Sequence, residues 1–182
     1  YAAGKKVSIS SSYALLKSGN AITIAAENNG KISITSIKRS QGTPSYRGEL
    51  TIKNVSGKGL TVVNKLPIEQ YLYSVVSSEV SSYYATEAIK AQAVTARSYA
   101  YARLNSATYK SLGADVDDST SYQVYNNIAE NATIKEAVDA TKNIVIKDGS
   151  KIIATFFFST SFGQTAEPSE VWGGSAEDKY YN

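Results

Sequence analysis

The chain has 182 residues, a length that suits one domain with a sizeable core. Hydrophobic residues make up 42% and charged residues 19% of it, which is ordinary for a globular protein and excludes a disordered one. The net charge of +3 is mild, and no dense Lys/Arg run indicates nucleic-acid binding. No apolar run reaches the roughly 18–20 residues that cross a bilayer, so we expect no membrane span in this chain.

Histidine and cysteine are both absent from the sequence. Their absence excludes disulfides, thiolate catalysis, a Ser–His triad and nearly every zinc site. We therefore expect no metal and no cofactor, and acid–base chemistry has to use Glu, Asp, Lys or Tyr. The 14 tyrosines would suit sugar binding in a cleft, but they suit ordinary packing equally well. No signal peptide is evident, so we expect a mature or trimmed piece of a protein.

Residues 1–64 predict a β-rich region, because short segments of alternating apolar and polar residues are separated by Gly, Asn and Pro. Residues 65–104 predict two central helices. The remainder, 105–182, predicts a short helix, a β-hairpin that turns at Asp148-Gly149, and a polar C-terminal loop. Strands therefore lie toward both ends with helices between them, which predicts an α+β fold in a single domain over 1–182.

The first central helix is expected from about Leu66 to Val80, with proline in its first turn. Its apolar stripe continues onto Glu79, where a core residue would be expected. Desolvation on that face and the helix dipole in the last turn would both raise the pKa of Glu79. A glutamate that stays protonated near neutral pH suits a general acid for glycosidic cleavage. On periodicity alone we favour the simpler alternative, that the helix end frays and Glu79 points into water.

The second central helix is expected within residues 85–105, which are rich in alanine and free of Gly and Pro. Glu87 and Lys90 are spaced to pair one turn apart. Arg97 falls near the edge of the packed face, where its guanidinium would reach Glu79 or a substrate oxygen. A surface arginine with a packed stem is the alternative that the residues alone favour.

Polar residues also follow the apolar strand of the C-terminal hairpin, a position that suits hydrogen bonding to a ligand as well as an ordinary turn. Those we consider are Ser159, Thr160, Ser161, Gln164 and Thr165. The single tryptophan, Trp172, would stack on a sugar ring or simply hold its loop. Gln123 and Tyr125 in the central loop are open to the same two interpretations.

Several segments match the pattern of one bacterial family in order along the chain. They are YRGEL (46–50), VNKLPIEQYLYSVVSSEV (63–80), EAIKAQAVTARSYA (87–100), QVY (123–125), AVDATKNIVI (137–146) and FSTSFGQT with EVWGG (158–165 and 170–174). Together they resemble the SpoIID/LytB family, the stage II sporulation protein D domain of cell-wall enzymes. The two central helices form the longest and most specific part of the match.

The resemblance implies an extracytoplasmic lytic transglycosylase that cleaves the MurNAc-GlcNAc bond of peptidoglycan glycan strands stripped of peptides. It implies that Glu79 is the catalytic acid and then base, and that Arg97 is also needed. It further implies that substrate is bound by Ser78, Gln123, Tyr125, Ser159, Thr160, Ser161, Gln164, Thr165 and Trp172. A lytic transglycosylase needs one carboxylate, because the 6-hydroxyl of the muramic acid itself closes on C1.

The sequence departs from the family pattern beside these residues. Phe158 stands where the family has histidine, Phe162 replaces a glycine, and Ser77 and Val80 flank Glu79 in place of proline and methionine. The zinc pair of some members is not carried over. A non-catalytic glycan-binding module that recruits or activates a cell-wall amidase therefore remains the alternative. A two-carboxylate hydrolase that also uses Asp117 or Asp118 is a third reading.

Overall fold

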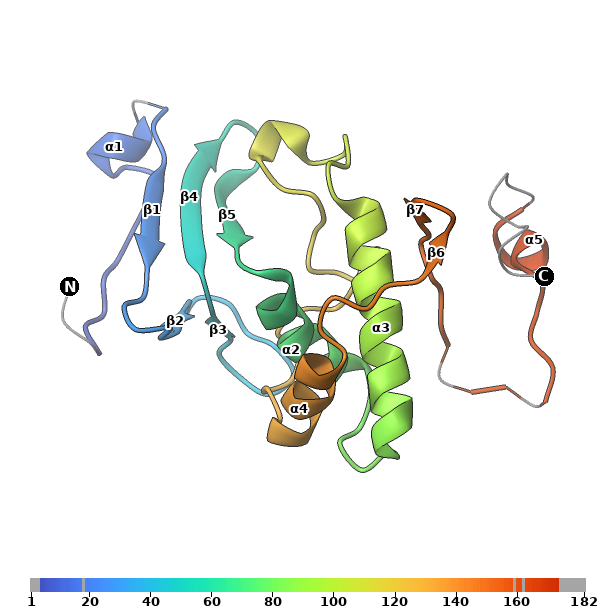
Figure 1. Ribbon diagram of the computed structural model, residues 1–182. Helices are drawn as coiled ribbons and strands as arrows, with labels where there is room; N and C mark the ends of the chain where they lie inside the picture. Colours follow the sequence, from blue (N-terminus) through green and yellow to red (C-terminus); the bar gives the residue numbers. More distant parts are fainter. Residues whose placement is uncertain (1–3, 18, 159, 162, 174–182) are drawn as a thin grey trace.

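The computed structural model describes residues 4–17, 19–158, 160–161 and 163–173. It is an α+β structure, as the sequence predicts: a β-rich N-terminal part lies beside a cluster of three helices, and a small hairpin follows near the C-terminus (Figure 1). The change from strands to helices occurs close to the boundary expected at residue 65.

The N-terminal part contains a three-stranded antiparallel sheet in the order β1-β4-β5. Its strands are β1 (Ile22–Ala25), β4 (Glu49–Val55) and β5 (Gly59–Lys65). A one-turn helix, α1 (Ala14–Lys17), places the buried Leu16 beside this sheet. A second, two-stranded ladder joins β2 (Ile32–Ser33) to β3 (Ser45–Tyr46) and directs the chain toward the helices.

The backbone conformation at Gly48 explains why the YRGEL segment has a glycine at this position. Its φ of +73° is a conformation that side chains rarely adopt, and a Cβ there would overlap the carbonyl oxygen of Lys65 and approach the Cβ of Leu66 at 2.8 Å. Glycine therefore lets β4 begin directly against the end of β5, where the chain enters the first central helix.

The helical cluster consists of α2 (Ile68–Glu79), α3 (Thr86–Arg103) and α4 (Ala132–Ala140). Figure 1 shows α2 and α4 between the sheet and the long α3. The first turn of α4 is capped by Asn131, whose side chain accepts hydrogen bonds from the backbone N–H groups of Thr133 and Ile134. All three helices were expected within a few residues of their observed ends.

The core joins the helices to the ends of the strands. Leu72, Val75 and Val76 of α2 are fully buried, which confirms the apolar stripe read from the sequence. They pack with the alanine-rich face of α3 and with residues from the strands, α4 and the 105–131 segment. The remaining buried members are Tyr46, Leu50, Ile89, Ala93, Ala96, Tyr125, Ile134, Ala137 and Val138.

The C-terminal part differs from expectation in detail. The hairpin is limited to β6 (Lys147–Asp148) and β7 (Lys151–Ile152), and its two-residue loop is Gly149-Ser150 instead of Asp148-Gly149. After β7 the chain runs along α3 without strand pairing, and the hydroxyl of Thr155 donates to the carbonyl of Thr95 at 2.8 Å. A 3-10 turn (Lys110–Leu112) and α5 (Pro168–Trp172) complete the described elements.

Candidate functional site

Glu79 is the last residue of α2, and the structure leaves it half-buried. Desolvation by burial raises the pKa of Glu79, and a hydrogen bond from the backbone N–H of Val124 partly offsets the rise. The sequence predicted both the position at the helix end and the direction of this shift. The carboxyl group is thus favoured in its protonated form while part of it still reaches solvent.

A second carboxylate, Asp117, lies in the same neighbourhood. The pKa of the Tyr71 hydroxyl is raised mainly by burial, and the charges of Glu79 and Asp117 both add to that rise. Desolvation acts to raise the pKa of Asp117 itself, but hydrogen bonds from Ser119 and Tyr109 outweigh it and leave the pKa lowered. The pKa of Glu79 is therefore raised and that of Asp117 lowered, and both carboxylates act electrostatically on Tyr71.

Arg97 does not meet Glu79. Its side chain is completely buried, and its guanidinium forms a two-pronged ion pair with Glu69 in the first turn of α2. The Nε atom donates to Oε1 at 3.1 Å, and Nη2 donates to Oε2 at 2.8 Å. The same group also donates to the carbonyls of Val138 and Ile144, each at 3.1 Å. Arg97 therefore ties α2, α3, α4 and the following turn together, which corrects both the expected contact with Glu79 and the surface alternative.

Glu69 is the partner that sequence reasoning missed. It lies in the first turn of α2, and it precedes Leu72 by three residues and Val76 by seven. That spacing places Glu69 on the same buried face as the stripe that leads to Glu79. The pattern therefore contained two carboxylates on one apolar face, and a buried arginine on the neighbouring helix neutralises the first of them.

Gln123 and Tyr125 lie in the core and not on a cleft wall, which corrects the expectation that they contact substrate. They are 3% and 6% exposed. The amide of Gln123 accepts from Tyr71 at 3.1 Å and donates to the carbonyl of Ala96 at 3.3 Å. The Tyr125 ring stacks on Tyr71 at 5.3 Å between centroids, and its hydroxyl donates to Asn64 at 3.1 Å. The QVY segment thus packs the wall behind Glu79.

The other expected substrate residues are not gathered around Glu79 by any described contact. The hydroxyl of Ser78 donates to the carbonyl of Ser74 in its own helix at 2.9 Å. Thr160, Ser161, Gln164 and Thr165 lie on exposed chain beyond β7. Ser159 and the side chain of Trp172 lie outside the described residues. Roles in substrate binding for these residues stay predictions.

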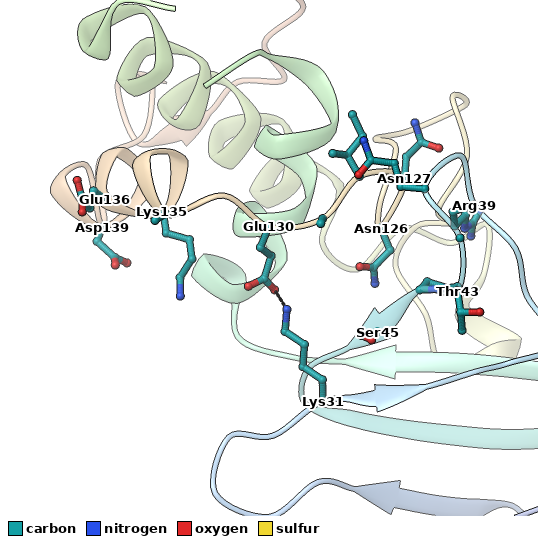
Figure 2. Close-up of a pocket in the computed structure, with 16 residues that line it drawn as sticks. Lys31, Arg39, Thr43, Ser45, Asn126, Asn127, Glu130, Lys135, Glu136 and Asp139 are labelled. Atoms are coloured by element: carbon teal, nitrogen blue, oxygen red, sulfur yellow. Dashed lines mark ion pairs between the residues drawn. The ribbon is translucent and has the colours of Figure 1, made fainter. Parts of the chain in front are cut away.

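A separate groove opens on another side of α2. It has a volume of about 690 Å³ and lies between residues 39–45, which precede and include β3, and residues 126–139, which include α4. Lys31 and Glu130 form an ion pair of 2.8 Å across the groove, and Figure 2 shows this pair between Asn126 and Arg39 on one side and Lys135, Glu136 and Asp139 on the other. The hydroxyl of Ser40 also joins the two walls by donating to the carbonyl of Asn127 at 2.6 Å.

Helical geometry separates this groove from Glu79. The residues of α2 that hold the groove walls are Tyr73, Ser74 and Ser77, which bond Asp139, Asn126 and Asn131 respectively. At about 100° per residue, Glu79 lies about 120° around the helix from Tyr73, about 140° from Ser74 and about 160° from Ser77. Neither Glu79 nor Arg97 lines the groove.

Two further features of the described structure bear on the possible functions. Within the described parts of the chain, no group of three or more Asp or Glu side chains is arranged to hold a metal ion. None of the helices described is both long and apolar enough to cross a membrane.

Comparisons with known proteins agree with the motif pattern. The profile of the family SpoIID, "Stage II sporulation protein", matches residues 56–147. The chain is 33% identical to Stage II sporulation protein D of Bacillus subtilis over 60% of its length. It is 33% identical to the Amidase enhancer of the same organism over 57%, and 41% identical to an uncharacterized protein of Brachyspira hyodysenteriae over 63%. These alignments cover 36%, 14% and 31% of the respective relatives. No solved structure matches significantly.

Proposed function

Because the chain belongs to the SpoIID family, we propose that it is a lytic transglycosylase domain acting on peptidoglycan glycan strands outside the cytoplasm. The substrate bond is the β-1,4 linkage between MurNAc and GlcNAc, in strands without stem peptides. The chain covers 36% of the length of Stage II sporulation protein D of Bacillus subtilis, so this proposal concerns the domain and not a whole protein.

Glu79 would perform both proton transfers. As a carboxylic acid it donates its proton to the glycosidic oxygen, and the C1–O bond of MurNAc breaks. The 6-hydroxyl oxygen of the same MurNAc then bonds to C1, and the Glu79 carboxylate takes the hydroxyl proton. The products are a 1,6-anhydro-MurNAc end and a free GlcNAc 4-hydroxyl, with Glu79 protonated again and no water consumed.

The observation that carries the proposal is the state of Glu79. It is the one carboxylate on the buried stripe of α2 that has no basic partner among the described residues, since Glu69 pairs with Arg97. Burial raises its pKa and the hydrogen bond from the Val124 N–H acts in the opposite direction, so the balance favours the protonated form more than in an exposed glutamate. We assign Arg97 a positioning role, in which it fixes the start of α2 and with it the direction of the helix that ends at Glu79.

Glu79→Gln tests the proposal, because the amide keeps the size of the side chain and cannot exchange the proton. Purified glycan strands treated with amidase are incubated with each protein, and the products are identified by mass spectrometry. We expect anhydro ends from the wild type and none from Glu79→Gln. Glu87→Gln, the same change on an exposed carboxylate of α3, is the matched control and should keep the activity. Equal product from wild type and Glu79→Gln would refute the role of Glu79.

A non-catalytic role is the second candidate, and the name of one relative favours it. The relative from Bacillus subtilis that is named Amidase enhancer shares 33% identity with this chain. In that case the domain would bind glycan and increase the activity of a cell-wall amidase. The assay is amidase turnover with and without the domain. Stimulation that is equal for wild type and Glu79→Gln, without anhydro ends from either, would favour this reading.

A further inference from the structure

Gln123 is a buried polar residue that the proposed cleavage steps do not use. Its side chain is 3% exposed, and both ends of its amide are bonded. Oε1 accepts from the Tyr71 hydroxyl of α2 at 3.1 Å, and Nε2 donates to the carbonyl of Ala96 in α3 at 3.3 Å. The amide therefore forms a bridge between the two central helices, and the donor and the acceptor together fix its orientation.

The residues that follow Gln123 hold the same segment against α2. The Tyr125 ring stacks on the Tyr71 ring, with 17° between their planes. The side chain of Asn126 accepts from the Ser74 hydroxyl at 3.1 Å, one turn further along the helix. The backbone of this segment is therefore positioned by α2 on both sides of residue 124.

Val124 lies between these bonded residues, and its backbone N–H donates a hydrogen bond to the Glu79 carboxylate. Tyr71, which bonds Gln123, precedes Glu79 in the same helix by about 12 Å, at 1.5 Å per residue. The donor and the acceptor of the Glu79 bond are therefore held by the same two segments of chain. Because the donor is a backbone atom, its position depends on Gln123 more than on the side chain of Val124.

We propose that Gln123 is a positioning residue for cleavage, which aims the Val124 N–H at the carboxylate of Glu79. In this arrangement the N–H stabilises the negative charge that Glu79 acquires as it gives its proton to the glycosidic oxygen. The same bond keeps the carboxylate in place until it takes the proton of the 6-hydroxyl. The inference deepens the proposed function and rests on it for this role in cleavage.

The two causes that set the pKa of Glu79 make the inference testable. Burial raises this pKa, and the Val124 bond lowers it. The other titratable groups that act together with Glu79 on Tyr71 include Tyr99 of α3 and Asp117. Burial raises the pKa of Tyr71, whereas for Asp117 desolvation is outweighed by hydrogen bonds and the pKa is lowered. Neither of these two groups should therefore change its charge while Glu79 titrates.

Gln123→Met removes both polar ends of the side chain and keeps about its length. The Glu79 carboxyl is titrated by NMR in protein carrying carbon-13 glutamate, and its resonance is assigned by its absence from Glu79→Gln. We expect a higher pKa of Glu79 in Gln123→Met than in the wild type, because the carboxylate loses its N–H donor. A purely structural role predicts the opposite sign, since looser packing admits water and reduces desolvation. On amidase-treated glycan strands, kcat should fall about tenfold or more with little change in KM.

Tyr71→Phe is the second variant, and it also serves if Gln123→Met does not fold. It removes the donor to Gln123 and keeps the ring that stacks on Tyr125, so the pKa of Glu79 should again rise. Tyr46→Phe is the matched control. It removes a hydroxyl from another buried ring, 6.1 Å from the Tyr125 ring, and leaves the bonds of Gln123 intact, so Glu79 should titrate as in the wild type.

The titration and the cleavage assay can fail separately. A wild type that does not cleave glycan would refute the proposed function, while the titration would still decide whether Gln123 aims the N–H at Glu79. A pKa of Glu79 that is unchanged or lower in the folded Gln123 and Tyr71 variants would overturn the inference. A rise in Tyr46→Phe as large as that in Tyr71→Phe would overturn it as well.

Discussion

Replacing Arg97 should destabilise the fold severely, because the arginine is the junction of three helices. Arg97→Met keeps most of the stem and removes the charge. It leaves Glu69, whose side chain is 12% exposed, without its partner, and it leaves the carbonyls of Val138 and Ile144 without the 3.1 Å donors they now have. Removing one member of a buried ion pair costs about 3–5 kcal/mol. For a chain of this size that is a fall in Tm of roughly 6–20 °C.

The assay is urea unfolding followed by circular dichroism, with the free energy of unfolding extrapolated to water. Lys90→Met is the matched control, because it breaks the exposed pair between Lys90 and Glu87, 2.7 Å apart within α3. That pair should contribute no more than about 0.5 kcal/mol. Replacing both members of the buried pair, with Glu69→Leu and Arg97→Met together, should recover part of the loss, since no isolated charge remains.

A loss of less than about 1 kcal/mol for Arg97→Met would refute the structural role assigned to this arginine. If that variant also folds normally but is inactive on glycan, the result would indicate that Arg97 contacts the substrate directly. The positioning role predicts instead that activity falls with stability, and that stability and activity recover together in a stabilised background.

Three further predictions follow from single residues. Gly48→Ala should cost about 1–3 kcal/mol more than Gly57→Ala in urea unfolding, because both glycines have φ +73° but only Gly48 lies against Lys65; equal losses would contradict this reading. The raised pKa of Glu79 means that the folded state holds the proton of this carboxyl more tightly than the unfolded state does. The free energy of unfolding of the wild type relative to Glu79→Gln should therefore fall as pH rises above about 4. A difference that increases with pH would contradict the raised pKa. For Glu130, the hydrogen bonds from Arg47 and Lys31 outweigh burial, so its pKa is lowered. Its contribution to the free energy of unfolding should be present above about pH 4 and should be lost as the pH falls further. In acid unfolding, Glu130→Gln should remove this pH dependence.

The helices and the fold class could be predicted from the sequence because they depend on local patterns. Leu72, Val75 and Val76 are spaced for one helical face, and they are fully buried. The position of Glu79 at the end of that face, with its raised pKa, follows from the same spacing. By contrast, apolar and polar residues alternate in the segment KVSISSS (6–12), but the first described strand begins only at Ile22, since alternation without a partner strand does not make a ladder.

The partners of the polar residues could not be predicted, because they come from segments far apart in the sequence. Arg97 is 28 residues from Glu69 and 47 from Ile144, and only the packing of α2 against α3 and α4 brings them together. Gln123 and Tyr125 lie in a loop without periodicity, so nothing in their spacing distinguished a core position from a cleft wall. The groove joins residues 39–45 to residues 126–139, and the one family motif that overlaps these segments, at residues 137–146, gave no sign that they meet. The single-domain boundaries over 1–182 stay a prediction.

The central claim is that Glu79 drives cleavage without water, and the most direct measurement is digestion of peptide-free glycan strands in water enriched in oxygen-18. A lytic transglycosylase leaves 1,6-anhydro-MurNAc ends that carry no label. A hydrolase that pairs Glu79 with Asp117 leaves reducing ends that carry one labelled oxygen. We predict unlabelled anhydro ends from the wild type and no new ends from Glu79→Gln. Labelled reducing ends, or intact strands with both proteins, would contradict the proposed mechanism.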